Sequence, residues 1–111
     1  MTSTDNLLGA LELLVLKALE NGSMHGWGIT LHIQNISNDV LHIEEGSLYP
    51  ALHRMEKAGW VKAEWGLSEN NRRARFYRIT AAGRTQLRSE QQKWESVAQA
   101  IALVLRGQAM A

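Results

Sequence analysis

The sequence predicts a mainly α (α+β) fold in which helices surround a small two-stranded ribbon. Apolar residues recur at helical spacing through the first half of the chain, change to strict alternation between residues 60 and 79, and return to helical spacing afterwards. At 111 residues the chain is long enough for one domain with a modest core. The change of period indicates a β-hairpin set between helical elements.

The first helix is predicted from a broad apolar face near the N-terminus. Its periodic positions are Leu7, Leu8, Leu11, Leu14, Val15, Ala18 and Leu19. Thr4 or Asp5 can cap its start, and Asn21-Gly22 can end it. Leu13 and Leu16 lie off the main stripe, so we expect a partner subunit to cover a second face of this helix.

A second helix is predicted over residues 23–37, with Ser23 as its cap. Its inward positions are Ile29, Ile33 and Ile36. Gly26 and Gly28 each disfavour this helix by roughly 1 kcal/mol relative to alanine. Both glycines are explained if another helix or a DNA backbone approaches closely. The segment that follows contains Leu41-His42-Ile43, which we interpret as a brief strand.

The third helix is predicted from Ser47 to Gly59. Ser47 is a natural cap, and Pro50 then falls in the first turn, where its missing N–H has no partner to lose. The buried stripe consists of Leu48, Leu52 and Met55. Tyr49, His53 and Lys57 are spaced by four and form an exposed stripe on the opposite side.

The ribbon is predicted from Trp60 to Leu67 and from Ala74 to Ile79. Four arginines occur within seven residues that contain no acid, namely Arg72, Arg73, Arg75 and Arg78. Residues 1–50 carry one base and six acids, a net charge of −5, whereas residues 51–111 carry eleven bases and five acids, a net charge of +6. This segregation favours a basic surface for DNA over an arginine-rich solvated loop.

The last helix is predicted from its cap at Thr80 to about Arg106. Leu87, Trp94 and Ile101 stand seven apart, and the positions between them are filled by Val97, Ala98, Val104 and Leu105. Such a seam packs on another helix, so we expect a homodimer through this helix, assisted by Leu7, Leu8 and Leu11 of the first. The chain then divides into a winged helix-turn-helix at residues 1–80 and a long C-terminal dimerisation helix at residues 81–111.

Four segments of the chain resemble the PadR-like transcriptional regulators. These segments are residues 8–16 (LGALELLVL), 25–29 (HGWGI), 46–56 (GSLYPALHRME) and 75–83 (RFYRITAAG). The single terminal helix is similar to the short branch of that family. Trp27 is a departure, since members often carry tyrosine there.

The resemblance implies a homodimer that reads an inverted-repeat operator, with the third helix in a major groove and the wing in a minor groove. The DNA-binding candidates are Ser47, Tyr49, His53, Arg54, Lys57, Lys62, Arg72, Arg73 and Arg75. Arg54 suits guanine or a phosphate, and Arg72 and Arg73 suit a narrow minor groove. Tyr49 has the alternative of closing the helix onto the wing, and Arg78 that of pairing with Glu56 or Glu64. Repression is favoured because occupancy of a promoter is sufficient to block it.

Trp94 has two interpretations. In multidrug-binding members of the resembling family, a tryptophan of the arm helix stacks on small planar aromatic ligands between the subunits. Trp94 lies at the matching position, which makes such a ligand a secondary hypothesis. Packing in the dimer is the first, because an aromatic at helical spacing is more often core.

Other functional classes find little support in the sequence. An enzyme is disfavoured because Ser47 and His53 lie on different faces of one helix, with no acid placed to orient the histidine. No two of the four histidines have a spacing of three or four, which disfavours a metal-responsive regulator, and we expect no cofactor. A winged-helix module that binds protein instead of DNA has little reason to concentrate arginines.

No signal-peptide or membrane-span pattern is present, so we expect a cytoplasmic location without membrane contact.

Overall fold

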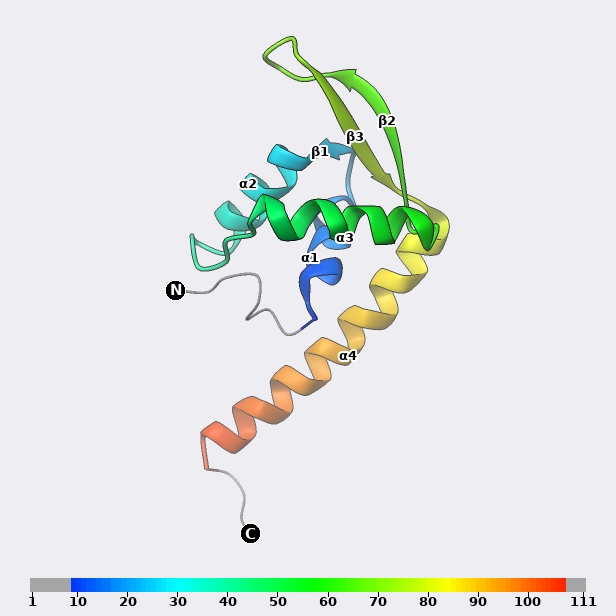
Figure 1. Ribbon diagram of the computed structural model, residues 1–111. Helices are drawn as coiled ribbons and strands as arrows, with labels where there is room; N and C mark the ends of the chain where they lie inside the picture. The colour runs from blue at the N-terminus through cyan, green and yellow to red at the C-terminus, as the bar shows by residue number, and fades with distance from the viewer. Residues whose placement is uncertain (1–8, 108–111) are drawn as a thin grey trace.

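The computed structural model describes residues 9–107, and its helices support a small sheet (Figure 1). In chain order the elements are α1 (Leu11–Ala18), β1 (Met24–His25), α2 (Gly26–Ile36), α3 (Glu45–Lys57), β2 (Val61–Leu67), β3 (Arg73–Ile79) and α4 (Ala81–Leu105). The three strands form one antiparallel sheet in the order β1-β3-β2. The mainly α (α+β) fold is therefore confirmed. The β2–β3 ribbon, hereafter the wing, projects from one end of the helical body, and α4 leaves in another direction.

The core lies where α1, α2 and α3 meet the base of the wing. Its largest fully buried side chains are Leu16, Leu19, Ile29, Leu48, Leu52, Met55 and Leu87. The predicted buried stripe of α3 is confirmed. Leu87 comes from α4, so the first turns of the terminal helix complete the core.

The start of α2 differs from the prediction. His25, not Ser23, is the N-cap, and its Nδ1 accepts a hydrogen bond of 3.0 Å from the Gly28 N–H. The reason is tertiary: Met24 and His25 are extended because they pair with β3 as the short strand β1. The helix can begin only after that strand ends.

The start of α3 also differs. Its N-cap is Glu44, so Ser47 is the third helical residue and its N–H already bonds to the Glu44 carbonyl at 3.0 Å. Ser47 was therefore wrongly predicted as the cap. The expected strand at Leu41-His42-Ile43 is reduced to a single bridge at Leu41.

Gly26 has the close neighbour that its position in a helix suggested. A Cβ atom at Gly26 would lie 2.8 Å from Cζ of Tyr49 and closer still to the Tyr49 hydroxyl. α3 thus approaches the first turn of α2 closely at Gly26, where the absence of a side chain leaves room for Tyr49. At Gly28 a Cβ would make only an ordinary contact, 3.5 Å from the ring of His25.

The junction between the wing and α4 is closely packed. Thr80 caps α4 as predicted, since its hydroxyl accepts from the Gly83 N–H at 3.0 Å and donates to the Gly59 carbonyl at 2.6 Å. Gly83 lies against the Trp60 carbonyl, where no Cβ would fit. These contacts attach the start of α4 both to the end of α3 and to the base of the wing.

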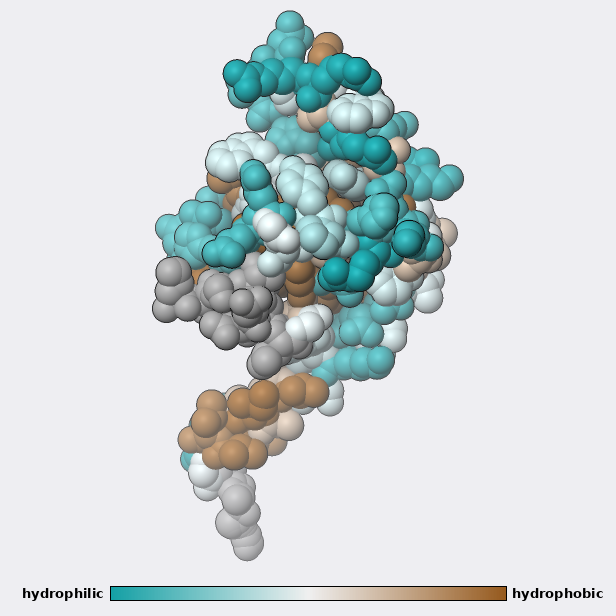
Figure 2. All heavy atoms as spheres, in the orientation of Figure 1, coloured by the Kyte–Doolittle hydropathy of each residue, from teal (hydrophilic) through white to brown (hydrophobic). Residues whose placement is uncertain are grey.

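Beyond Leu87 the helix extends away from the body as an arm. The Cα radius of gyration is 15.7 Å, whereas a compact chain of this length has about 13 Å. Figure 2 shows that the far part of the arm carries a concentrated apolar surface, while the body and wing in this view are mostly hydrophilic. The arm thus presents apolar surface that its own subunit does not cover.

Candidate nucleic-acid interface

The outer face of α3 is polar and accessible. Tyr49, His53 and Lys57 are all exposed, on the side of the helix opposite the buried Leu48 and Leu52. The predicted exposed stripe is therefore confirmed. A helix that is anchored by one face and presents a polar stripe on the other has the shape needed to enter a major groove.

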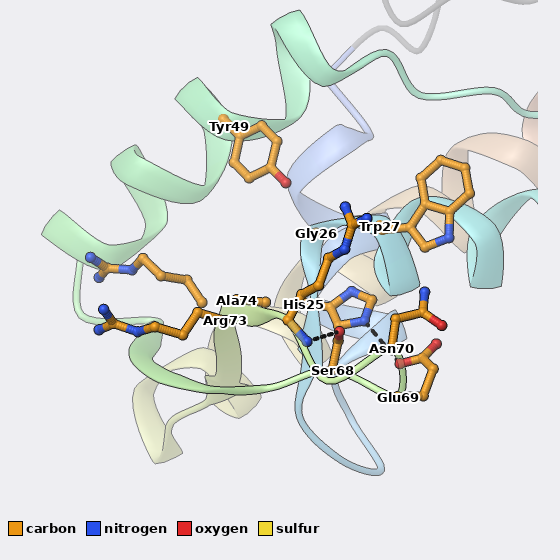
Figure 3. Close-up of a pocket in the computed structure, with 11 residues that line it drawn as sticks. His25, Gly26, Trp27, Tyr49, Ser68, Glu69, Asn70, Arg73 and Ala74 are labelled. Atoms are coloured by element: carbon orange, nitrogen blue, oxygen red, sulfur yellow. Dashed lines mark hydrogen bonds and ion pairs between the residues drawn. The ribbon is translucent and has the colours of Figure 1, made fainter.

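Tyr49 lies at the edge of this stripe nearest α2. Its side chain is 45% exposed, and its hydroxyl lies against Gly26 (Figure 3). Burial, with a smaller contribution from the Glu45 carboxylate, raises the pKa of the Tyr49 phenol. The phenol is therefore neutral at physiological pH and can act as a hydrogen-bond donor. Tyr49 packs on α2, whereas the alternative prediction placed it against the wing.

A groove of about 470 Å³ runs between the start of α2, Tyr49 and the outer part of the wing (Figure 3). Its lining residues are His25, Gly26, Trp27, Tyr49, Ser68, Glu69, Asn70, Arg72, Arg73, Ala74 and Arg75. Three of the four clustered arginines border this groove, and the acid among its lining residues, Glu69, bonds to His25. The groove thus has a cationic wall on the wing side.

The wing is connected to α3 by an ion pair. Arg75 Nη2 donates to Glu56 Oε2 at 3.1 Å. Glu56 was predicted as a possible partner of Arg78, but the strand alternation places Arg78 on the other face of the ribbon. Arg75 is therefore both a groove residue and the residue that holds the wing to α3.

A second connection joins the wing turn to the start of α2. The His25 ring nitrogen Nε2 lies 3.4 Å from Glu69 Oε1, and the ring edge packs on Phe76 with centroids 5.2 Å apart. A backbone hydrogen bond at Glu69 and the bond with His25 hold the pKa of the Glu69 carboxyl below its ordinary value. The sequence reasoning missed this role of His25, for which the HGWGI segment offered no direct signal.

Five predicted DNA-binding residues do not line the groove. His53 and Lys57 lie on the exposed stripe of α3, and the other three lie elsewhere. Arg54 donates from Nε to Glu12 Oε2 of α1 at 3.2 Å, on the side of α3 away from the wing. Lys62 is on the same ribbon face as Arg78, opposite Arg73 and Arg75. Ser47, half-buried within the first turns of α3, also lies outside it.

The predicted dimer residues fall into three groups. Leu7 and Leu8 lie outside the described residues. Leu11 is half-buried against the core and Leu87 is only 2% exposed within it, so Leu87 is not available to a partner. The remaining positions form the uncovered arm surface: Trp94 (half-buried), Val97, Ala98, Ile101, Val104 and Leu105. A helical seam can be shared between two subunits or, as at Leu87, be used within one.

Residues 15–89 match the "Transcriptional regulator PadR-like family". The chain belongs to the PadR-like family. It is therefore a DNA-binding transcriptional regulator and not an enzyme. The transcriptional regulator Rv3488 of Mycobacterium tuberculosis is 33% identical over 92 residues, which cover 83% of this chain and 82% of the relative.

Solved structures of PadR-like and other regulators have the same architecture. A transcriptional regulator from Clostridium thermocellum is 29% identical, with a TM-score of 0.79 over 92% of this chain and 96% of that one. A PadR-like transcriptional regulator from Bacillus cereus is 25% identical, with a TM-score of 0.78 over 96% of this chain and 100% of that one. The winged helix-turn-helix with a long terminal helix is therefore shown by sequence and structure together.

The described residues hold neither a cluster of metal ligands nor a helix fit to span a membrane. Between residues 9 and 107 no three histidine, aspartate or glutamate side chains gather as metal ligands. Over the same range no helix combines the length and the apolar character that crossing a bilayer needs.

Proposed function

We propose that this regulator is a homodimeric repressor that binds an inverted-repeat operator through α3 and the wing. The observation that carries the proposal is the groove in which the polar edge of α3 faces the arginines of the wing. A helix beside a cationic ribbon can contact a major groove and the adjacent minor groove of one duplex.

Each residue of the interface has a proposed role. Tyr49, His53 and Lys57 would read or approach base edges from the outer face of α3, where they are exposed. Arg72 and Arg73 would enter the minor groove, where negative potential is greatest and where their guanidinium groups also meet the phosphates that border it. Phosphate contacts alone are proposed for the four remaining candidates, namely Ser47, Arg54, Lys62 and Arg75. Arg54 and Arg75 would have to exchange their carboxylate partners, Glu12 and Glu56, for DNA.

Dimerisation is proposed to occur through the arm. Val104 and Leu105 are 75% and 80% exposed, and Val97 and Ile101 are about half exposed. Residues 1–80 would then read DNA while residues 81–111 join the subunits, with the first turns of α4 shared between the two tasks. Because the proposed target is DNA, we propose that the protein acts in the cytoplasm.

A salt series of duplex binding, using DNA from the region upstream of the gene, tests the proposal. The logarithm of the binding constant should fall with the logarithm of salt concentration by about 0.9 per neutralised phosphate. Replacing both Arg72 and Arg73 with alanine should flatten that slope by up to about 2. The double variant Arg84→Ala/Arg88→Ala removes the same charge from the exposed surface of α4 and should leave the slope unchanged. Equal slopes for all three proteins would remove the wing from the interface.

A small planar aromatic ligand is the second candidate for this chain's partners. Trp94 lines a hollow of about 160 Å³ together with Glu90, Lys93 and Val97. An aromatic cation would meet the indole face and the Glu90 carboxylate there. Titration with such a cation should quench the fluorescence of the wild-type dimer but not that of a Trp94→Phe variant. Equal quenching in both proteins would remove Trp94 from the ligand site.

A further inference from the structure

Trp65 is an exposed tryptophan at an unusual place. It lies on β2 in the outer half of the wing and is 58% exposed. Strand alternation and register place it on the ribbon face that includes the buried Val61 and Tyr77. That face enters the core at the base of the wing and passes beyond the core at Trp65. Core packing therefore does not account for this indole.

Two arginines lie over the indole of Trp65. The guanidinium carbon of Arg73 is 4.6 Å from the ring centroid, and that of Arg75 is 5.6 Å away. Arg75 is the cross-strand partner of Trp65, and Arg73 is its diagonal neighbour. Both distances lie within the range in which a cation is attracted to an aromatic face.

The two arginines are restrained differently. Arg75 also bonds to Glu56 of α3, which neutralises its charge and fixes its position. For Arg73, no carboxylate lies within ion-pair distance among residues 9–107. The indole is therefore the main group that orders the Arg73 side chain, and it does so without neutralising it. The guanidinium remains available to an anion.

We propose that Trp65 is a positioning residue for DNA binding, which holds Arg73 extended along the groove wall so that its guanidinium meets the phosphodiester backbone. The inference deepens the proposed function and rests on it. An unrestrained arginine must lose rotamer freedom when it binds a phosphate, whereas a stacked one has already lost much of it. Trp65 would thus raise affinity through Arg73, without a contact of its own to DNA.

Three substitutions distinguish the effect of aromatic stacking from the effects of apolar bulk and of positive charge. Trp65→Phe keeps an aromatic face, Trp65→Leu keeps apolar bulk without one, and Arg73→Lys keeps the charge without the planar group. We expect Trp65→Leu and Arg73→Lys each to weaken binding of the upstream duplex about 2- to 5-fold at low salt, and Trp65→Phe to weaken it less. Trp65 is 58% exposed and Arg73 is exposed on the wing, so all three variants should fold.

The double variant Trp65→Leu/Arg73→Lys decides whether the two residues act together. If Trp65 acts through Arg73, the double variant binds no more weakly than Arg73→Lys alone, because the stacking is already lost. If the fold-losses in affinity of the two single variants multiply in the double variant, the inference is overturned. It is also overturned if both single variants bind with wild-type affinity and salt slope. If the wild-type protein itself retards no duplex at low salt, the proposed function falls together with the inference. Wild-type binding with unaffected variants removes the inference alone.

Discussion

Replacement of Ile101 by alanine should weaken the proposed dimer strongly. Ile101 is 53% exposed at the centre of the uncovered arm surface. Complete burial of an isoleucine side chain stabilises by roughly 1.5–3 kcal/mol, so covering the exposed half contributes about 1 kcal/mol per copy. A two-fold axis uses each residue twice, which gives about 2 kcal/mol per dimer and roughly a 30-fold increase in the dissociation constant.

Leu103 provides a matched control two residues away. It is 47% exposed, close to the value for Ile101, but successive residues on a helix are 100° apart, so it points to nearly the opposite side. Sedimentation equilibrium over a dilution series should show the roughly 30-fold shift for Ile101→Ala and less than about a 3-fold shift for Leu103→Ala. Equal shifts in the two variants would mean that the seam does not define the interface. A wild-type protein that is monomeric at all concentrations would refute the reasoning entirely.

Three further predictions concern the junctions of the fold, and each is measured by thermal or urea unfolding. Gly83→Ala places a methyl group against the Trp60 carbonyl, a backbone atom that cannot turn aside, and should destabilise by about 2 kcal/mol or more. Thr80→Val keeps the shape of the cap but removes its hydroxyl, and should destabilise by about 1 kcal/mol; no change would show that water replaces both bonds. Gly26→Ala should destabilise through its contact with Tyr49, and the loss should shrink in a Tyr49→Ala background.

The elements of this fold were predictable where a periodic pattern repeats, whereas the starts of α2 and α3 were not. The buried stripe of α3 and the alternation in the wing each depend on several residues that fit one pattern. A helix start depends on a single residue leaving the extended conformation. His25 is extended because β1 pairs with β3, which is a contact across fifty residues of chain. Propensity favoured Ser23, and the tertiary contact overrode it.

The interface was predictable as a surface but not as a set of pairs. Spacing by four correctly placed Tyr49, His53 and Lys57 on one exposed face of α3. The spacing could not identify the partner of Glu56, because this pairing depends on which face of the ribbon meets α3. No role for Trp65 was predicted from the sequence. Trp65 shares a ribbon face with the buried Val61, and only the structure shows that the core ends before it.

In the proposed dimer, the junction at Thr80 means that the packing of the arms should set the spacing of the two proposed DNA-reading surfaces. Thr80 bonds to Gly59 at the end of α3 and to Gly83 in the first turn of α4, and Leu87 fixes the next turn in the core. No flexible linker separates the arm from α3 or the wing, since β3 ends at Ile79 and α4 begins at Ala81. A rotation of one arm against the other would therefore carry each α3 with it. Substitutions in the seam that preserve dimerisation but alter the crossing of the arms should accordingly change the preferred distance between operator half-sites, which binding to duplexes of graded spacing would measure.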